Sequence, residues 1–334
     1  VDVAKSTDGG RSFSSRVVAV HGDLVSADPD KPYLAVDAQP GSPYRGTIYV
    51  SYTDFVAGIQ IRTVVSRDGG STWSKSLPIS RLGSPAAGDF IQYSLPVVAP
   101  DGTVYIFWME SDGIFGHLRI EYTRSRNGGK SWSQPADVAS NLPSPGGFSL
   151  RIAKSDDTAQ RIPLLSNSFP AAAIALDGTI YVAWTDFAEG SCDPTTAFSP
   201  LCENADLRLS LSRDGGKHWT SPVKVNDDAT RSDQFMPWIA THPDGLLSLA
   251  WLDRRLDPDN VNYDVFYSNT VDGVTFLPNL RVSTASSLVG TSTQQGLGDY
   301  NGLAATADAV FPIWGDMRVQ NDMEVLTATG RLGP

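Results

Sequence analysis

Acidic residues end five similar apolar segments of this sequence, and arginines follow the acid in two of them. The five acids are Asp54, Glu110, Asp186, Asp253 and Asp316. The last two continue as Asp253-Arg254-Arg255 and Asp316-Met-Arg318. Carboxylates can act as general acids and bases or as ligands of hard cations, and a guanidinium group binds a carboxylate through two parallel hydrogen bonds. The pattern therefore predicts acid–base chemistry or anion recognition.

Repetition separates these acids into two groups. A position that recurs in every segment more often serves the fold than the chemistry, so we expect Asp54, Glu110 and Asp186 to accept backbone N–H groups from the following loops. The Asp-Arg clusters occur in only two segments and have two interpretations. They are either ion pairs that brace a loop or an anion-binding site.

The acids lie at the ends of predicted strands. The segments are Tyr49-Val-Ser-Tyr-Thr-Asp54, Tyr105-Ile-Phe-Trp-Met-Glu110, Tyr181-Val-Ala-Trp-Thr-Asp186, Ser248-Leu-Ala-Trp-Leu-Asp253 and Phe311-Pro-Ile-Trp-Gly-Asp316. Their β-branched and aromatic residues are typical of strands. Another short apolar strand precedes each one, and three of these pairs are joined by an Asp-Gly turn.

A second motif recurs between these strand pairs. Ser6-Thr-Asp8-Gly-Gly-Arg-Ser-Phe13 returns as Ser66-Arg-Asp68-Gly-Gly-Ser-Thr-Trp73, Ser125-Arg-Asn127-Gly-Gly-Lys-Ser-Trp132 and Ser212-Arg-Asp214-Gly-Gly-Lys-His-Trp219, with a shorter copy at Thr270-Val-Asp272-Gly-Val-Thr-Phe276. The Asp or Asn positions are 60, 59, 87 and 58 residues apart. Asp-Gly and Asn-Gly supply the positive φ of a tight hairpin. Each copy is predicted to form a hairpin tip.

The two repeats together define one unit of four antiparallel strands in about 60 residues, which is a propeller blade. No segment shows a sustained helical period. The fold class is therefore all-β, with a single propeller domain over 1–334. The short turns lie on one face of such a domain, and the variable loops, where sites are usually built, lie on the other. The acids, the arginines, Asp299-Tyr300 and Tyr93 all belong to the second face.

The motif Ser-x-Asp-x-Gly-x-x-Trp resembles the Asp-box, or BNR repeat, of the sialidase superfamily. This resemblance implies a six-bladed β-propeller of four-stranded antiparallel blades. It also implies an active site with an arginine clamp for a carboxylate, a tyrosine nucleophile with a neighbouring glutamate, and an aspartate as acid/base. The stretches Trp251-Leu-Asp-Arg-Arg255, Gly298-Asp-Tyr-Asn-Gly302 and Trp314-Gly-Asp-Met-Arg318 resemble exported bacterial Asp-box proteins.

The resemblance implies roles for individual residues. Arg255 and Arg318 correspond to clamp residues, with Arg254 as the alternative, and Tyr300 to the nucleophile beside Asp299. Asp54 or Asp30 corresponds to the acid, and Glu110 is one of two glutamates near suitable loops. The other substrate-binding candidates are Asp253, Asp316, Asp186 and Tyr93. The family's Phe- or Tyr-Arg-Ile-Pro motif is absent from the N-terminal part; only Arg161-Ile162-Pro163, in mid-chain, matches three of its residues.

The predicted blade count leaves one blade incomplete. Five inner strands begin near residues 33, 95, 171, 237 and 301, whereas residues 1–20 form a hairpin with a turn motif but no inner strands. We expect that the first of six blades lacks its two inner strands in this chain; the alternative is an irregular closure in which the two ends of the chain share a blade.

Composition limits the function classes. The 334 residues are 41% hydrophobic and carry a net charge of −11, which argues against nucleic-acid and membrane-surface binding. Cys192 and Cys202 lie in one loop and predict a local disulfide, hence a secreted or periplasmic protein whose targeting segment has been removed. We expect a monomer.

The leading function is a glycoside hydrolase that acts on an acidic sugar and needs no cofactor. A carbohydrate or another small molecule would be the substrate. One alternative is a calcium-dependent hydrolase of esters or phosphoesters, because Ca²⁺ prefers six to eight oxygen ligands and this face is rich in Asp and Asn. Another is a non-catalytic propeller that binds glycans or proteins, with aromatic residues such as Tyr93 stacking on sugars.

Overall fold

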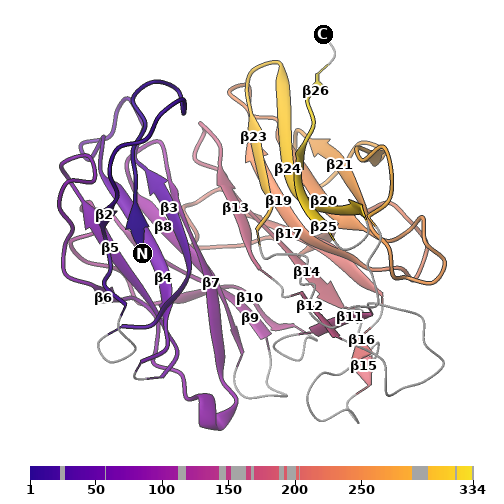
Figure 1. Cartoon of the computed structure of the whole chain (residues 1–334), viewed down its shortest axis with the longest axis horizontal. Helices are drawn as coiled ribbons and strands as arrows, with labels where there is room; N and C mark the ends of the chain where they lie inside the picture. Colours follow the sequence, from indigo (N-terminus) through magenta and orange to yellow (C-terminus); the bar gives the residue numbers. More distant parts are fainter. Residues whose placement is uncertain are drawn as a thin grey trace. The chain divides into compact units, whose positions relative to one another are not determined.

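The computed structural model describes residues 1–22, 27–56, 58–111, 118–142, 148–151, 163–166, 169–187, 192–193, 201–202, 204–287, 300–319 and 322–332. The chain divides into two compact units, Val1–Ser140 and Asn141–Pro334 (Figure 1). Each unit is built from antiparallel four-stranded sheets, and among the described residues every regular element apart from one short 3₁₀ helix, η1 (Pro85–Ala87), is a strand.

Unit 1 contains two four-stranded sheets and one hairpin. The first sheet has the order β3 (Pro29–Val36), β4 (Ile48–Asp54), β5 (Gln60–Ser66) and β6 (Leu77–Pro78). The second has β7 (Phe90–Val98), β8 (Val104–Ser111), β9 (Leu118–Ser125) and β10 (Ala136–Leu142), whose end reaches unit 2. β1 (Asp2–Val3) pairs with β2 (Val17–Val18).

Unit 2 contains three four-stranded sheets. One joins β13 (Ala171–Ile174), β14 (Ile180–Phe187), β17 (Ala205–Ser212) and β18 (Val223–Lys224), and the next joins β19 (Gln234–Thr241), β20 (Leu247–Asp253), β21 (Asp264–Thr270) and β22 (Leu280–Arg281). The last has β23 (Gly302–Ala305), β24 (Ala309–Val319) and β25 (Asp322–Thr327), with β26 (Gly330–Arg331) returning to pair with β24. Two short pairs accompany them, β11 (Phe148–Arg151) with β12 (Pro163–Ser166) and β15 (Cys192–Asp193) with β16 (Leu201–Cys202).

The recurrent turn motif forms hairpin tips, as the sequence predicts. In the turn after β5, the Asp68 carboxylate accepts the N–H groups of Ser71 and Thr72 at 3.0 and 2.9 Å. The Ser66 hydroxyl donates to Asp68 at 2.8 Å and accepts the Gly70 N–H at 2.9 Å. Hydrogen bonds from the Thr72 side chain and backbone lower the pKa of Asp68 to about 2. The side chain thus replaces the backbone partners that a tight turn leaves unpaired.

The predicted blade unit is confirmed in five sheets, which is one fewer than the six blades expected from the resemblance. The β1–β2 pair carries the first turn motif, and no further strand joins it among the described residues. The last sheet departs from the others because its fourth strand, β26, lies beside β24 and not beside β25.

Three inner strands, β3, β7 and β19, begin earlier than the sequence indicates because each contains a β-bulge, whereas β13 and β23 begin within one residue of the predicted positions. The register shifts after Asp30 in β3, after Gln92 in β7 and after Phe235 in β19. In the three bulges a non-glycine residue adopts positive φ, namely Lys31 (50°), Tyr93 (63°) and Met236 (53°). No Gly or Asn marks these positions, so local composition does not predict them.

Candidate functional site

The end of β20 holds the first Asp-Arg cluster. The indole of Trp251 donates to Asp253 at 2.8 Å, and the Arg255 backbone N–H donates to the same carboxylate at 2.9 Å. The Arg255 guanidinium forms an ion pair with Asp253 at 2.8 Å and donates to Asp227 at 2.6 Å and to Asn279 at 2.9 Å. Arg255 also lies over the Phe266 ring, 4.4 Å from its centroid.

The end of β24 repeats this arrangement. Trp314 donates to Asp316 at 2.9 Å, and the Arg318 backbone N–H donates to it at 2.9 Å. Arg318 Nε and Nη2 donate to the two Asp316 oxygens at 2.8 and 2.9 Å, while Nη1 donates to Thr284 at 3.0 Å. We call each set of three, Trp251–Asp253–Arg255 and Trp314–Asp316–Arg318, a Trp–Asp–Arg brace.

The braces and their neighbouring loops engage most of the guanidinium N–H donors of Arg255 and Arg318, the two predicted clamp residues. Arg318 uses its bidentate edge on Asp316, and Arg255 uses all three of its terminal nitrogens within its own loops. For Arg255 and Arg318, the geometry therefore favours the loop-bracing interpretation over anion recognition.

Arg254 differs from both of these arginines. Its side chain is fully buried, its Nη1 donates to the Asn260 carbonyl at 3.0 Å, and this nitrogen lies 3.6 Å from the Asp233 carboxylate. Its Nε and Nη2 have no hydrogen-bond partner. The guanidinium lies over the Phe235 ring at 5.3 Å. The nitrogens Nε and Nη2 form the edge with which arginine binds a carboxylate side-on, so Arg254 carries an unpaired bidentate fork.

Burial and hydrogen bonds give the neighbouring charges different pKa values. Burial raises the pKa of Asp253, and the donors from Arg255 and Trp251 offset this only in part. Burial also opposes ionisation of Asp316, but Arg318 and Trp314 outweigh it and lower its pKa to about 2. Burial lowers the pKa of Arg254 to about 10, so it stays charged at neutral pH.

The repeated acids at the other strand ends have largely structural partners. Asp54 accepts the backbone N–H groups of Asp28 at 3.0 Å and Val56 at 3.2 Å, as expected. Asp186 is nearly buried and lies opposite Asp206 on β17.

Glu110 belongs to a buried carboxyl pair that the sequence does not predict. It accepts a hydrogen bond from Arg81, and the Trp108 indole donates to the neighbouring Glu121 at 3.1 Å. Burial, together with the hydrogen bond and charge of Glu110, raises the pKa of Glu121 to about 9. Glu121 lies opposite Trp108 in the middle of the sheet, so only the strand register brings the two acids together.

The two tyrosine candidates have different surroundings. Tyr93 is buried at its bulge, with the Lys31 ammonium 5.6 Å from the centroid of its ring. Tyr300, just before β23, is 48% exposed. Asp299 lies outside the described residues, and so does the Arg161–Ile162 part of the mid-chain motif.

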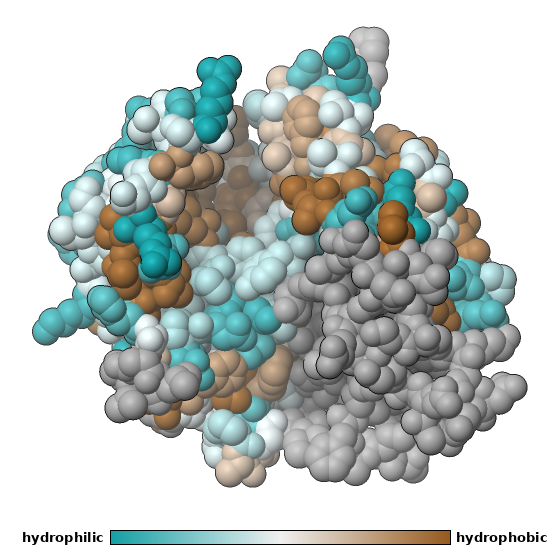
Figure 2. Space-filling model, in the orientation of Figure 1, coloured by the Kyte–Doolittle hydropathy of each residue, from teal (hydrophilic) through white to brown (hydrophobic). Residues whose placement is uncertain are grey.

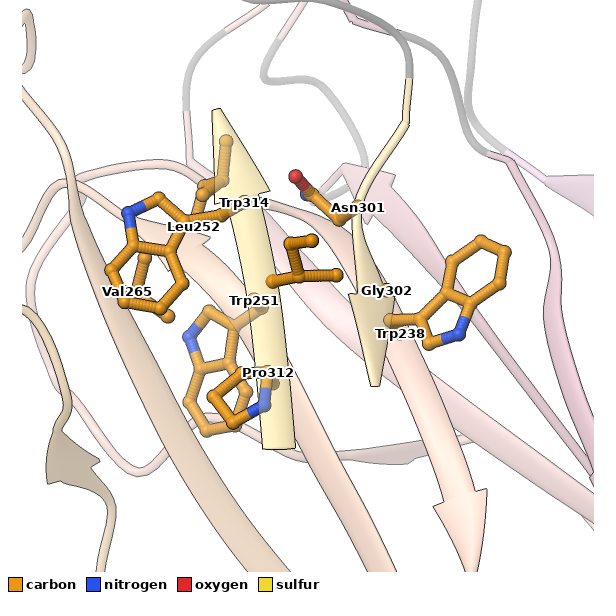
Figure 3. A pocket seen from close by; sticks show the side chains of 10 residues that line it. Trp238, Trp251, Leu252, Val265, Asn301, Gly302, Pro312 and Trp314 are labelled. Atoms are coloured by element: carbon orange, nitrogen blue, oxygen red, sulfur yellow. The ribbon is translucent and has the colours of Figure 1, made fainter. Parts of the chain in front are cut away.

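A narrow crevice lies between β20, β23 and β24 in unit 2 (Figure 3). It is lined by tryptophans of three strands, Trp238, Trp251 and Trp314, and by Asn301 at the start of β23. Its volume is about 10 Å³, which is the room for one water molecule. The crevice is therefore too small for a sugar, and its tryptophans serve packing.

The remaining predictions concern metal, cysteines and membranes. No group of three or more His, Cys, Asp or Glu residues in the described ranges could hold a metal ion, and the calcium interpretation stays a prediction. Cys192 and Cys202 are directly opposite each other in the β15–β16 pair, but their side chains lie outside the described part, so the disulfide also stays a prediction. Within the described residues, no helix is long and apolar enough to cross a membrane.

Comparison with known proteins supports the fold. No protein-family model and no curated protein matches this sequence. The chain is similar to the GH93 α-L-arabinofuranosidase of Fusarium graminearum in complex with arabinobiose, at 13% identity over 91% of this chain and 93% of the other, with a TM-score of 0.52. The α-L-arabinanase of Penicillium chrysogenum has the same identity and coverage and a TM-score of 0.53. The NanB sialidase of Streptococcus pneumoniae (a K499G mutant) is 11% identical over 92% of this chain and 59% of the other, with a TM-score of 0.53.

These neighbours are carbohydrate-active β-propellers, and the chain has the same all-β, sialidase-like propeller fold. The fold predicted from the turn motif and the strand repeats is thus confirmed. Because one scaffold of this type serves several activities, the reaction must be argued from the side chains.

Proposed function

We propose that this protein is a carbohydrate-active propeller that hydrolyses glycosides of an acidic sugar, in the manner of an exo-sialidase. The observation that carries the proposal is Arg254, a fully buried arginine with Nε and Nη2 unpaired. Buried polar groups in proteins are nearly always hydrogen-bonded, so this edge favours a role in binding an oxyanion. The carboxylate of an acidic sugar has the shape that the fork requires.

Arg254 takes the clamp role that the resemblance assigns first to Arg255 and Arg318. The neighbouring groups support a charged Arg254, because Asp233 and the Asn260 carbonyl hold Nη1 and leave the other edge unpaired. Since the side chain is fully buried, the groups that cover it must move when substrate enters. Tyr300, which is exposed at the start of the last sheet, is the proposed nucleophile.

The test is the hydrolysis of a fluorogenic sialoside beside neutral glycosides, including an arabinofuranoside, by wild type and Arg254→Met. Two hydrogen bonds to a charged group contribute about 3 kcal/mol, so kcat/KM for the sialoside should fall roughly 100-fold. Turnover of any neutral glycoside should not change. Met317→Leu, at the equivalent position of β24, is the matched control and should keep full activity.

Three other outcomes would replace this proposal. Turnover of the arabinofuranoside alone would give the protein the substrate class of its fungal structural neighbours. Ester hydrolysis that EDTA abolishes would move the chemistry to a calcium site. Silence on every substrate, with binding of glycans retained, would support the non-catalytic propeller.

The cellular location and the oligomeric state of the protein are also proposals. We expect an exported, monomeric protein whose Cys192 and Cys202 form a disulfide across the β15–β16 pair. Mass spectrometry before and after reduction tests the disulfide, and sedimentation tests the oligomeric state. The sialidase-like reaction requires no cofactor, so EDTA should leave sialoside turnover unchanged.

A further inference from the structure

Two neighbouring sheets of unit 2 are joined at their outer strands by a pair of reciprocal hydrogen bonds. The Asp227 N–H donates to the side-chain oxygen of Asn279 at 2.8 Å, and the Asn279 N–H donates to the Asp227 carboxylate at 2.8 Å. Arg255 donates to both side chains, at 2.6 and 2.9 Å. Because Asp227 follows β18 and Asn279 precedes β22, these bonds close the junction between the two sheets.

Arg81 occupies the position of Asp227 at the equivalent junction of unit 1. Pro78 of β6 and Lys224 of β18 hold the same place in the register of their sheets. Arg81 and Asp227 each follow three residues later. A guanidinium group therefore stands where unit 2 has the carboxylate that accepts the joining hydrogen bond.

Pro135 occupies the position of Asn279. The N–H groups of Ser133 and Leu277, two residues earlier, donate in the same way to the third strands of their sheets, at 2.9 and 3.0 Å. Proline has no N–H and no side-chain acceptor, and arginine has no carboxylate. Arg81 and Pro135 therefore cannot form either of the two bonds that join the sheets in unit 2.

A groove lies at this junction of unit 1. It has a volume of about 470 Å³ and is lined by residues 77–81 of the first sheet and 130–135 of the second. Small-molecule sites typically have volumes of about 300–1,000 Å³. Each side of the groove carries a proline, Pro78 or Pro135, which cannot donate to an added strand. The groove therefore suits a small molecule better than a peptide strand.

The lining combines apolar surface with unpaired polar side chains. Trp132, Leu77 and Pro78 supply apolar surface, and the last two are exposed. Lys130 and Gln134 are also exposed, and neither side chain has a hydrogen-bond or ion-pair partner among the described residues. Figure 2 shows hydrophilic and apolar residues side by side at the surface of unit 1. Sugars match such a lining, because their C–H faces pack on apolar rings while their hydroxyl groups bond to amides.

The charges at the groove favour an anionic sugar. Arg81 donates to Glu110 and Asp89, so its charge is compensated within the protein. Lys130 has no such partner in the described part of the chain, and its ammonium group can attract a carboxylate. The carboxylate of an acidic sugar supplies this anion, and the ring hydroxyls supply partners for Gln134.

We propose that this groove binds an acidic oligosaccharide through Lys130 and Gln134, as a second carbohydrate site. The site belongs to unit 1, whereas Arg254 belongs to unit 2, and binding in the groove requires no hydrolysis. The inference therefore goes beyond the proposed function. A protein that holds a polysaccharide at one site raises the concentration of neighbouring sugar units around its other sites.

The experiment measures binding of trigalacturonate, beside its neutral methyl ester, by titration calorimetry at low salt. The acid should bind with a Kd on the order of 10⁻⁴ M, and the ester about fivefold more weakly. Lys130→Ala should weaken binding of the acid about fivefold and leave binding of the ester unchanged. Gln134→Glu should weaken binding of the acid further, because it places a second carboxylate beside that of the sugar.

Lys217→Ala is the matched control, since it removes the same charge from the equivalent position of another turn. It should not change the affinity. The proposal is overturned by absence of binding, by equal affinity for acid and ester, or by equal effects of Lys130→Ala and Lys217→Ala.

Arg254→Met separates this site from the proposed active site. It should leave binding of trigalacturonate unchanged, and a loss of binding would place the trimer at Arg254 and not in the groove. None of these readouts requires turnover, so a failure of this proposal and a failure of the proposed function are distinguishable.

Discussion

The strand ends of β20 and β24 carry the same Trp–Asp–Arg brace but differ in the residue between the acid and the bracing arginine. That residue is Arg254 in one and Met317 in the other, and both are almost fully buried. Met317 packs among Phe235, Tyr263 and Trp314. Arg254 occupies the equivalent position with a charge that is only partly paired.

Comparing Arg254 with Met317 distinguishes the residues that the fold requires from a residue that a binding site would require. Each brace holds a carboxylate that two or more donors satisfy, and this arrangement is complete without any ligand. Met317 shows that the position inside the brace can be filled by an apolar side chain. A buried charge at this position costs desolvation that an apolar residue would avoid, and this cost is what the proposed binding role of Arg254 would account for.

The largest effect on stability is expected when an arginine is introduced into the brace at the end of β24, which holds an apolar residue. Met317→Arg would bury a guanidinium where the structure offers an apolar cluster, without the counterparts of Asp233 and Asn260. The free energy of unfolding should fall by about 3–5 kcal/mol, measured by urea denaturation.

Met317→Leu keeps the volume and should cost less than about 1.5 kcal/mol. If Met317→Arg proves as stable as Met317→Leu, the two positions tolerate charge equally, and burial no longer distinguishes Arg254.

The pH dependence of the two carboxylates should differ in sign. The pKa of Asp316 is lowered from 3.8 to about 2, so its contribution to stability is complete above pH 4 and is lost as the pH falls through 2. This contribution is about 2 kcal/mol. The pKa of Asp253 is raised, so its ionisation opposes folding, and that penalty disappears at acid pH.

Urea denaturation between pH 2 and 5 checks this contrast. Asp316→Asn should flatten the acid limb of the stability profile and match wild type at pH 2, whereas Asp253→Asn should steepen that limb. Identical profiles for the two variants would show that the braces are electrostatically equivalent.

The sequence predicted the parts of this structure that local chemistry determines. In the turn motif the Asp side chain accepts hydrogen bonds from backbone N–H groups of the same turn, as Asp68 does. The motif alone is therefore sufficient to predict a hairpin tip. The bulges at Lys31, Tyr93 and Met236 were not predictable, because they depend on pairing with the neighbouring strand and carry no turn residue.

The identity of the unpaired arginine was not predictable either. Arg255 is held by Asp227 and Arg318 by Thr284, which are 28 and 34 residues away along the chain. The spacing of residues within an Asp-Arg cluster contains no information about partners so far away along the chain. One signal was present in the sequence, since the residue inside the brace is Arg in one copy and Met in the other.

The smallest effect concerns the indole hydrogen bond of each brace, and a third tryptophan provides the control. Trp184 lies at the equivalent position of β14 and is fully buried, but its indole N–H has no hydrogen-bond partner. Trp184→Phe therefore measures the packing cost alone. Trp314→Phe loses the same packing and also the donor to Asp316, so it should be less stable than Trp184→Phe by about 1–2 kcal/mol.

Trp251→Phe should lie between these two variants. Asp253 retains three donor groups of Arg255 and a longer contact from Gln234 at 3.4 Å when the indole is removed. Urea denaturation of the three variants at pH 7 gives the order directly. If Trp251→Phe were the least stable of the three, the Asp253 brace would depend on its indole more than the Asp316 brace does. The apparent excess of donors around Asp253 would then not compensate for its burial.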